Sequence, residues 1–133
     1  MTEGRRPFVY PELDQAVAFH KAFMSKLGLQ SSQEVDETKL KATLERSMAV
    51  AQGRGDILTL AAFLMYGLIR DEPFGPGSTQ TGMALTLAFL LRNGVAVMAP
   101  DDEIAGLALG IGRGEVFVGM AEMWLRESAR PFR

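Results

Sequence analysis

The chain has 133 residues, of which 47% are hydrophobic and 23% charged, and its 14 basic and 16 acidic side chains give a formal net charge of −2. This length fits one domain with a single hydrophobic core. Without an excess of basic residues, the chain has no electrostatic attraction for a nucleic-acid backbone, so we expect no nucleic-acid partner. The absence of cysteine excludes a disulfide scaffold, a cysteine-ligated zinc site and a thiol nucleophile.

The sequence contains no convincing targeting or membrane segment. The first ten residues, MTEGRRPFVY, include two arginines, but no apolar stretch follows them as it would in a secretory signal. The longest uncharged stretches are 57–69, which is too short to span a bilayer, and 73–91, which opens with prolines and glycines. We therefore expect a cytoplasmic protein that has no membrane partner.

Apolar residues recur at helical spacing in the first half of the chain. A first helix is predicted over 11–27 and ends at Gly28, and a second is predicted over 36–52, with acidic residues at its start. Asp56 is expected to cap a third helix over 57–70. Because this third helix is apolar nearly all round, it should be buried on most sides.

The fourth predicted helix follows the clearest loop in the sequence, PFGPG at 73–77. Ser78 or Thr79 is expected to cap this helix, and Asn93-Gly94 is a typical helix end. Its large apolar residues surround the helix axis. We therefore predict that it is the central, buried helix of the domain.

Two more helices are predicted near the end of the chain. A short extended segment over 95–98 precedes a helix of about ten residues that opens at 100–103 and ends at the glycines 112 and 114. A sixth helix is expected over 116–128. The prediction is a compact all-α fold in which residues 1–133 form one domain of about six helices joined by short loops.

Few side chains are candidates for catalysis or metal binding. His20 is the only histidine and has no acidic residue four positions later, so we interpret it as structural and expect no metal site. The carboxylates at 101–103 suit the positive end of a helix. We interpret Arg126, Arg130 and Arg133 as solvated residues of the chain end.

The segment 72–82, EPFGPGSTQTG, is the most informative. A glycine-rich loop that runs into a helix N-terminus exposes backbone N–H groups and can bind an anion. The residues of this candidate anion-binding loop are Gly75, Gly77, Ser78, Thr79, Gln80 and Thr81. It lacks the lysine of a Walker A motif, and the alternative is an ordinary loop that leads into a helix.

This loop, the buried helix after it and FLLRNGV at 89–95 resemble the Fic/Doc family, and within it the short Doc (death-on-curing) toxins. In that family a motif of the type His-x-Phe-x-Asp-x-Asn-Lys-Arg precedes the central helix, and Phe-Leu-x-x-Asn-Gly-Val follows at the spacing seen here. The likeness covers about residues 8–126 and includes YPEL at 10–13 and LALGIGRGE at 107–115. It implies a Fic/Doc-like helical bundle around a central buried helix.

The resemblance is lost at the positions that carry the family's chemistry. The catalytic histidine corresponds to Glu72, the motif phenylalanine is kept as the core anchor Phe74, and the Mg²⁺-binding acid corresponds to Pro76. The asparagine, lysine and arginine correspond to Ser78, Thr79 and Gln80. Family members transfer AMP or phosphate from a nucleotide to a hydroxyl, and this transfer needs a base, cations and usually Mg²⁺.

Three hypotheses follow. The first is a degenerate, non-catalytic Doc-like protein of the toxin–antitoxin type, with no cofactor, that binds a protein partner such as an antitoxin-like segment or a translation factor. The second is an altered nucleotidyl- or phosphotransferase that acts on a protein hydroxyl, with Glu72 as base and ATP or another nucleotide with Mg²⁺. The third is a structural or homo-oligomerising helical module. Eight methionines and eight phenylalanines would suit an adaptable binding surface, although most of them are expected in the core.

Overall fold

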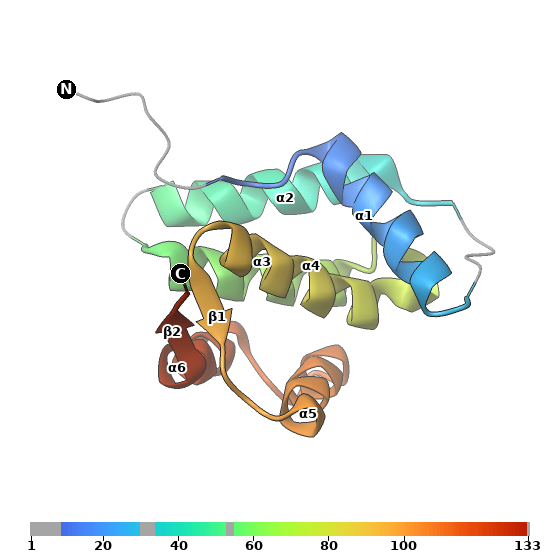
Figure 1. Cartoon of the computed structure of the whole chain (residues 1–133). Coiled ribbons are helices and arrows are strands. Elements are labelled where there is room, and N and C mark those ends of the chain that lie inside the picture. The colour runs from blue at the N-terminus through green and yellow to red at the C-terminus, as the bar shows by residue number, and fades with distance from the viewer. Residues whose placement is uncertain (1–8, 30–33, 53–54, 133) are drawn as a thin grey trace.

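The computed structural model describes residues 9–29, 34–52 and 55–132 (Figure 1). Over these residues the chain is mostly helical, which confirms the predicted all-α class. The elements are α1 (Leu13–Lys26), α2 (Glu37–Gln52), α3 (Ile57–Asp71), the 3₁₀ turn η1 (Gly75–Gly77), α4 (Ser78–Arg92), β1 (Val95–Val97), α5 (Asp101–Gly112), α6 (Val118–Ser128) and β2 (Ala129–Pro131). Among the described residues, none of the helices has the length and apolarity that crossing a bilayer requires.

Capping side chains set two of the helix starts. The Asp56 carboxylate accepts hydrogen bonds from the Leu58 and Thr59 N–H groups, both at 3.1 Å, which confirms it as the cap of α3. The Lys39 N–H donates to the Asp36 carboxylate at 3.0 Å, so α2 begins one residue after the predicted start. Each predicted helix matches an observed one, with ends that differ by at most two residues.

The helices α3 and α4 together form the centre of the domain. In Figure 1, α1 and α2 lie above this pair, and α5 and α6 lie below it. The fourth helix was predicted to be central, but α3 shares that position because it packs against α2, α4, α5 and α6. Gly82 lets the two helices approach closely, since a Cβ atom there would lie 3.1 Å from side-chain atoms of Leu68 and Ile69.

The two short strands pair in a way that the sequence pattern does not reveal. β1 and β2 are antiparallel, with Val95 opposite Pro131 and Val97 opposite Ala129. The predicted extended segment at 95–98 is therefore confirmed, whereas β2 was not predicted. Three residues that end in proline carry no strand periodicity, and their partner lies far away along the chain. The pairing holds the end of α6 beside the end of α4.

Arg126 is exposed, as predicted for a solvated residue of the chain end, and it also connects α6 to the start of α3 through contacts that were not predicted. Its guanidinium donates two hydrogen bonds to the Asp56 carboxylate, at 2.9 and 3.0 Å, and two to Glu122, at 2.7 and 3.2 Å. The Thr59 hydroxyl donates to Glu122 at 2.9 Å. Arg130 is exposed as predicted. Arg133 lies outside the described residues.

We expect Asp56→Ala to lower the free energy of unfolding by about 1–2 kcal/mol, because it removes both a helix cap and the partner of an exposed arginine. Asp56→Asn keeps the cap and should cost about half as much. The pKa of Asp56 is lowered to about 2, chiefly by the Arg126 hydrogen bonds. The stability it contributes is therefore present above its ordinary pKa near 4 and is lost as the pH falls through 2. Urea unfolding checks both variants, and equal losses for Asn and Ala would contradict the capping role.

Candidate functional site

The loop between α3 and α4 is a compact turn. Glu72 ends α3 with left-handed backbone angles of φ 55° and ψ 47°, and Gly75 is also left-handed at φ 69°. The Gly75 N–H donates to the Glu72 carbonyl at 3.0 Å, and the Asp36 N–H donates to the Pro73 carbonyl at 2.9 Å. The side chain of Phe74 is 1% exposed. The sequence PFGPG therefore folds around a buried phenylalanine anchor.

The first turn of α4 is built differently from the prediction. Its N-cap residue is Gly77, so the prediction that Ser78 or Thr79 caps this helix is wrong. The Ser78 hydroxyl is buried and accepts the N–H of Phe74 at 3.0 Å. It is used to close the loop, because the chain bends back on itself just before the helix. Gln80 is exposed.

His20 joins α1 to this loop and to α4. Its side chain is 1% exposed, and its ring stacks on Phe74 with 4.5 Å between the ring centroids. The Nδ1 atom lies 2.8 Å from the Thr81 hydroxyl, while Nε2 is buried without a hydrogen-bond partner among the described residues. Desolvation by burial lowers the pKa of His20, and Lys21 lowers it further, so the ring is neutral near pH 7. His20 is therefore a buried and packed side chain of the core, as a structural histidine would be.

Gly77 completes the packing around the histidine. A Cβ atom at this position would lie 3.3 Å from His20 Cε1 and 3.2 Å from the terminal methyl of Met24. Of the candidate anion-binding residues, Gly77, Ser78 and Thr81 are buried. The two buried hydroxyls are both bonded to neighbouring protein groups. A ligand that used either of these hydroxyls would therefore have to displace existing contacts.

An open pocket of about 610 Å³ lies on the outer side of the loop. Its lining residues are Glu34, Asp36, Lys39, Arg70, Asp71, Glu72, Pro73 and Gly75. Arg70 donates to the carbonyls of Ile111 and Gly112, at 3.3 and 3.2 Å. Its guanidinium therefore binds the free carbonyl groups at the C-terminal end of α5. The remaining charges are mainly acidic and would repel a nucleotide triphosphate.

No group of three or more histidine or carboxylate side chains among the described residues is placed to hold a metal ion. Asp71, the carboxylate next to Glu72, accepts hydrogen bonds from the Thr43 hydroxyl at 2.5 Å and from Arg46. It therefore connects α3 to α2.

We expect Glu72→Gly to raise the free energy of unfolding by up to about 1 kcal/mol, because glycine adopts left-handed angles without the strain of a side chain. Glu72→Ala keeps that strain and should change stability by less than about 0.5 kcal/mol. Urea unfolding of the two variants measures the difference. A destabilised glycine variant would mean that the Glu72 side chain makes a stabilising interaction.

Sequence reasoning identified the loop but missed the contact of His20 with Phe74 and Thr81, which lie more than fifty residues further along the chain. The position of His20 on the apolar side of α1 was a signal of burial but not of its partners. No model of a known protein family matches this sequence, and a search of curated proteins gives no significant match. The resemblance to the Fic/Doc family therefore rests on the motif residues quoted above.

Proposed function

We propose that this chain is a non-catalytic, Doc-like protein of the toxin–antitoxin type that acts by binding a protein partner. The proposal rests on the loop between α3 and α4, where the catalytic side chains of the family are replaced and the hydroxyl groups are bonded within the protein. Where Fic/Doc enzymes place a catalytic histidine, this chain has Glu72, and where they place the metal-binding acid it has Pro76. The Ser78 hydroxyl closes the turn, and the Thr81 hydroxyl contacts His20.

The loop lacks the lysine, the arginine and the metal-binding acid of the family motif, and this argues against transfer of a phosphate or AMP group. Such a reaction depends almost entirely on cations and hydrogen-bond donors that stabilise the phosphoryl oxygens. Losing one preorganised donor commonly costs about 3–4 kcal/mol of transition-state stabilisation, although such losses are not additive. Residues 73–91 carry no charged side chain, and four of the eight residues that line the pocket beside them are carboxylates.

The first test is the thermal stability of the full chain with and without millimolar ATP or GTP and Mg²⁺. A nucleotide at 100 times its Kd would add about 2.7 kcal/mol, which corresponds to a rise of several degrees in Tm. We expect no rise and no transfer of label from ATP to proteins of a cell extract. Nucleotide-dependent labelling that Glu72→Ala abolishes would replace this proposal with the altered transferase.

The second test concerns the partner. We expect the tagged full chain, expressed at its natural level in its own cells, to purify in a complex of fixed stoichiometry with another protein. Light scattering on the purified complex gives its mass. A complex that contains only copies of this chain would favour the oligomerising module and overturn the proposal.

A further inference from the structure

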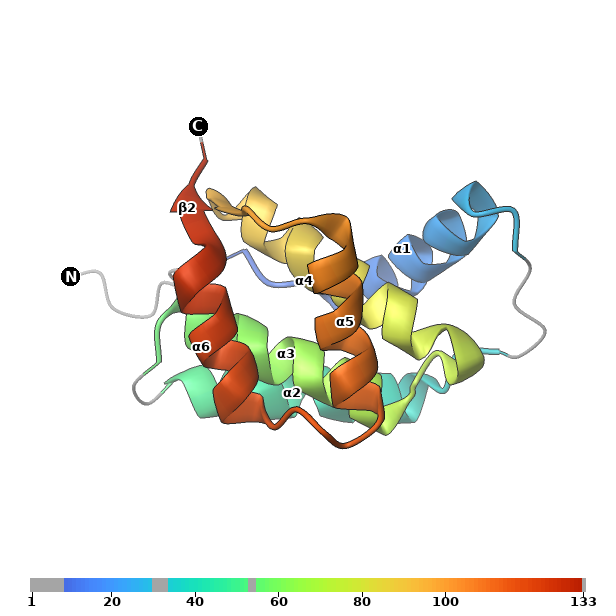
Figure 2. The same ribbon diagram turned by 90° about the horizontal axis from the view of Figure 1, so that it is seen from below.

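We propose that the exposed apolar side of α6, next to α5, is the docking surface for this partner, and that the partner presents a basic, amphipathic helix. This inference rests on the proposed function and adds the surface and the chemistry of the ligand. The α6 face, as we define it, consists of Phe117, Met120, Met123 and Trp124. In Figure 2, α5 and α6 lie side by side on the side of the molecule turned to the viewer.

The α6 face is unusually apolar for a surface. Phe117 is 61% exposed, Met120 50% and Met123 64%. Single exposed apolar residues are ordinary, but a contiguous group of them is typical of an interaction site. The backbone N–H of Phe117 donates to the Met120 sulfur at 3.5 Å, so the Met120 side chain lies against the start of the helix. Methionine side chains adapt their shape to a partner, which suits such a surface.

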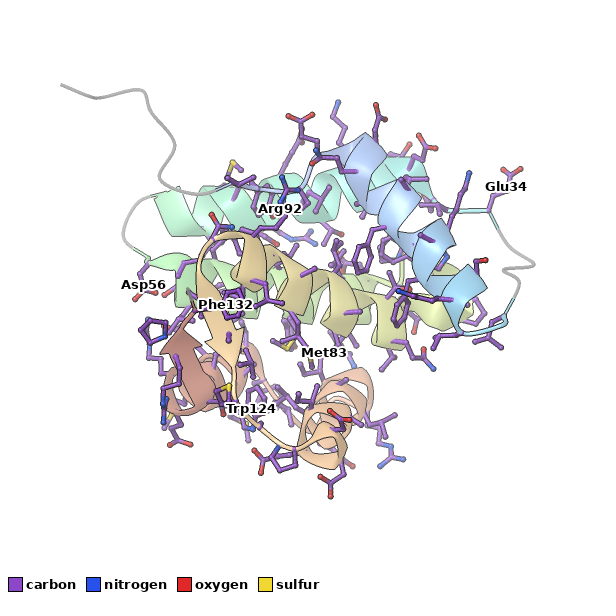
Figure 3. The ribbon with its side chains drawn as sticks, viewed as in Figure 1. Glu34, Asp56, Met83, Arg92, Trp124 and Phe132 are labelled. Atoms are coloured by element: carbon purple, nitrogen blue, oxygen red, sulfur yellow. The ribbon has the colours of Figure 1, made fainter. Side chains whose placement is uncertain are left out.

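Helical spacing arranges these side chains into one strip. Residues 117, 120 and 124 are three and four positions apart, so they follow one edge of the helix. Ala121 and Leu125 each follow a residue of this strip, so they lie about a quarter turn away from it; both are buried, and α6 packs against α3. The strip lies on the side that faces α5, because the Trp124 indole N–H donates to the Glu103 carboxylate at 3.2 Å. Figure 3 shows Trp124 between α6 and α5.

The α5 side of the strip leaves room for a ligand. A Cβ atom on Gly106 of α5, three residues after Glu103, would meet nothing within 4 Å. Met98, at the end of β1, is exposed, and its N–H donates to the Ser128 carbonyl at 2.8 Å. It therefore extends the apolar surface past the end of α6. An incoming helix would find apolar side chains along α6 and little obstruction from α5.

The acidic residues around the α6 face indicate which kind of ligand helix would bind there. Residues 98–132 contain six acidic and three basic side chains, whereas residues 1–97 contain ten of each. Asp101, Asp102, Glu103 and Glu127 are exposed, and none of them forms an ion pair with a described residue. Arg126 is held by Asp56 and Glu122. A ligand with lysines or arginines beside its apolar stripe would complement this acidic border.

The same charges disfavour two other occupants. A second copy that docked through its own α6 face would bring two acidic borders together, which costs free energy. An anionic lipid surface would be repelled for the same reason. A helix is favoured over an extended peptide because the strip has the length and spacing that match anchors at positions i, i+3, i+4 and i+7 of a helix.

The experiment uses a synthetic peptide of about 18 leucines and lysines with leucine at helical spacing, and a matched peptide with glutamate in place of lysine. Trp124 is the only tryptophan, so its fluorescence reports occupation of the α6 face. We expect the lysine peptide to bind the full chain, shift the Trp124 emission to shorter wavelength and bind more weakly in high salt. Equal binding of the glutamate peptide would overturn the proposal.

Matched variants locate the binding. Met120→Lys combined with Met123→Lys should weaken binding of the lysine peptide at least about tenfold. The control, Leu27→Lys combined with Leu29→Lys, changes two exposed apolar residues near the end of α1 and should leave binding unchanged. Asp102→Asn with Glu127→Gln should weaken binding several-fold, whereas Glu37→Gln with Glu45→Gln on α2 should not. Equal effects of test and control pairs would overturn the proposal.

The natural partner separates this inference from the proposed function. If the partner purified with the chain binds the Met120→Lys, Met123→Lys variant as tightly as the wild type, the α6 face is not its docking surface. This result overturns the docking inference and leaves the proposed function standing. If that variant abolishes self-association measured by sedimentation, the occupant is a second copy and the inference also fails. Nucleotide-dependent transfer would instead overturn the proposed function.

Discussion

Phe74→Ala should lower the free energy of unfolding by about 3–5 kcal/mol, a large part of the total stability of a domain of this size. Phe74 is 1% exposed and lies in the loop between α3 and α4, with His20 stacked on its ring. Truncation would leave a cavity and remove the main apolar contact of the buried imidazole. The loop would then lose the anchor that fixes its turn.

Urea unfolding followed by circular dichroism measures this effect. Phe132→Ala is the matched control, because Phe132 is exposed and its removal should change stability by less than about 1 kcal/mol. Phe74→Leu keeps most of the apolar volume and should cost less than Phe74→Ala. A loss for Phe74→Ala no larger than that for Phe132→Ala would mean that the loop is not anchored in the core.

The features predicted well are those with a local cause. Asp56 caps α3 through N–H groups only two and three residues away. Gly94 follows α4 with a left-handed φ of 84°, as a glycine after an asparagine at a helix end should. The hydrophobic periodicity of each helix is likewise a property of neighbouring residues. Sequence alone therefore gave the order of the helices and their approximate ends.

The features missed depend on residues far apart in the chain. Arg126 and Asp56 are separated by 70 positions, and no periodicity links them. Ser78 is a good capping residue, but the fold uses its hydroxyl to bind the Phe74 N–H. Local preference for a cap was overridden because the loop turns back at this point.

The candidate docking surface was also beyond sequence reasoning. Met98, Met120 and Met123 are exposed and therefore available for the adaptable binding surface that the methionine content would suit. Met65 and Met83, in contrast, are in the core. Composition does not distinguish the two groups, because exposure depends on which sides of a helix its neighbours cover. Only the arrangement of α3, α5 and α6 decides that.

His20 should make the folded state less stable as the solution becomes mildly acidic. Burial, and then Lys21, lower its pKa below the ordinary value near 6.5. The unfolded chain therefore takes up a proton at a higher pH than the folded protein does. The stability contributed by the neutral ring is complete above about pH 7 and is lost as the pH falls from 6.5 through the folded-state pKa, with a slope of at most about 1.4 kcal/mol per pH unit.

The chain offers a clean measurement of this effect, because His20 is its only histidine. The loop and α4 place no charged side chain against the ring, since residues 73–91 are uncharged, and Asp56 titrates near pH 2, well below this range. Urea unfolding of the wild type between pH 7.5 and about 5 should show a steady loss of stability. His20→Gln should be less stable than the wild type at pH 7.5, because it loses the stacking on Phe74, but its stability should vary much less over the same interval.

Parallel profiles for the two proteins would show that the imidazole is solvated in the folded state. If stability falls with acidity only in the wild type, the loss comes from charging the ring in a site where, among the described residues, one ring nitrogen has no partner and the other meets only a neutral hydroxyl.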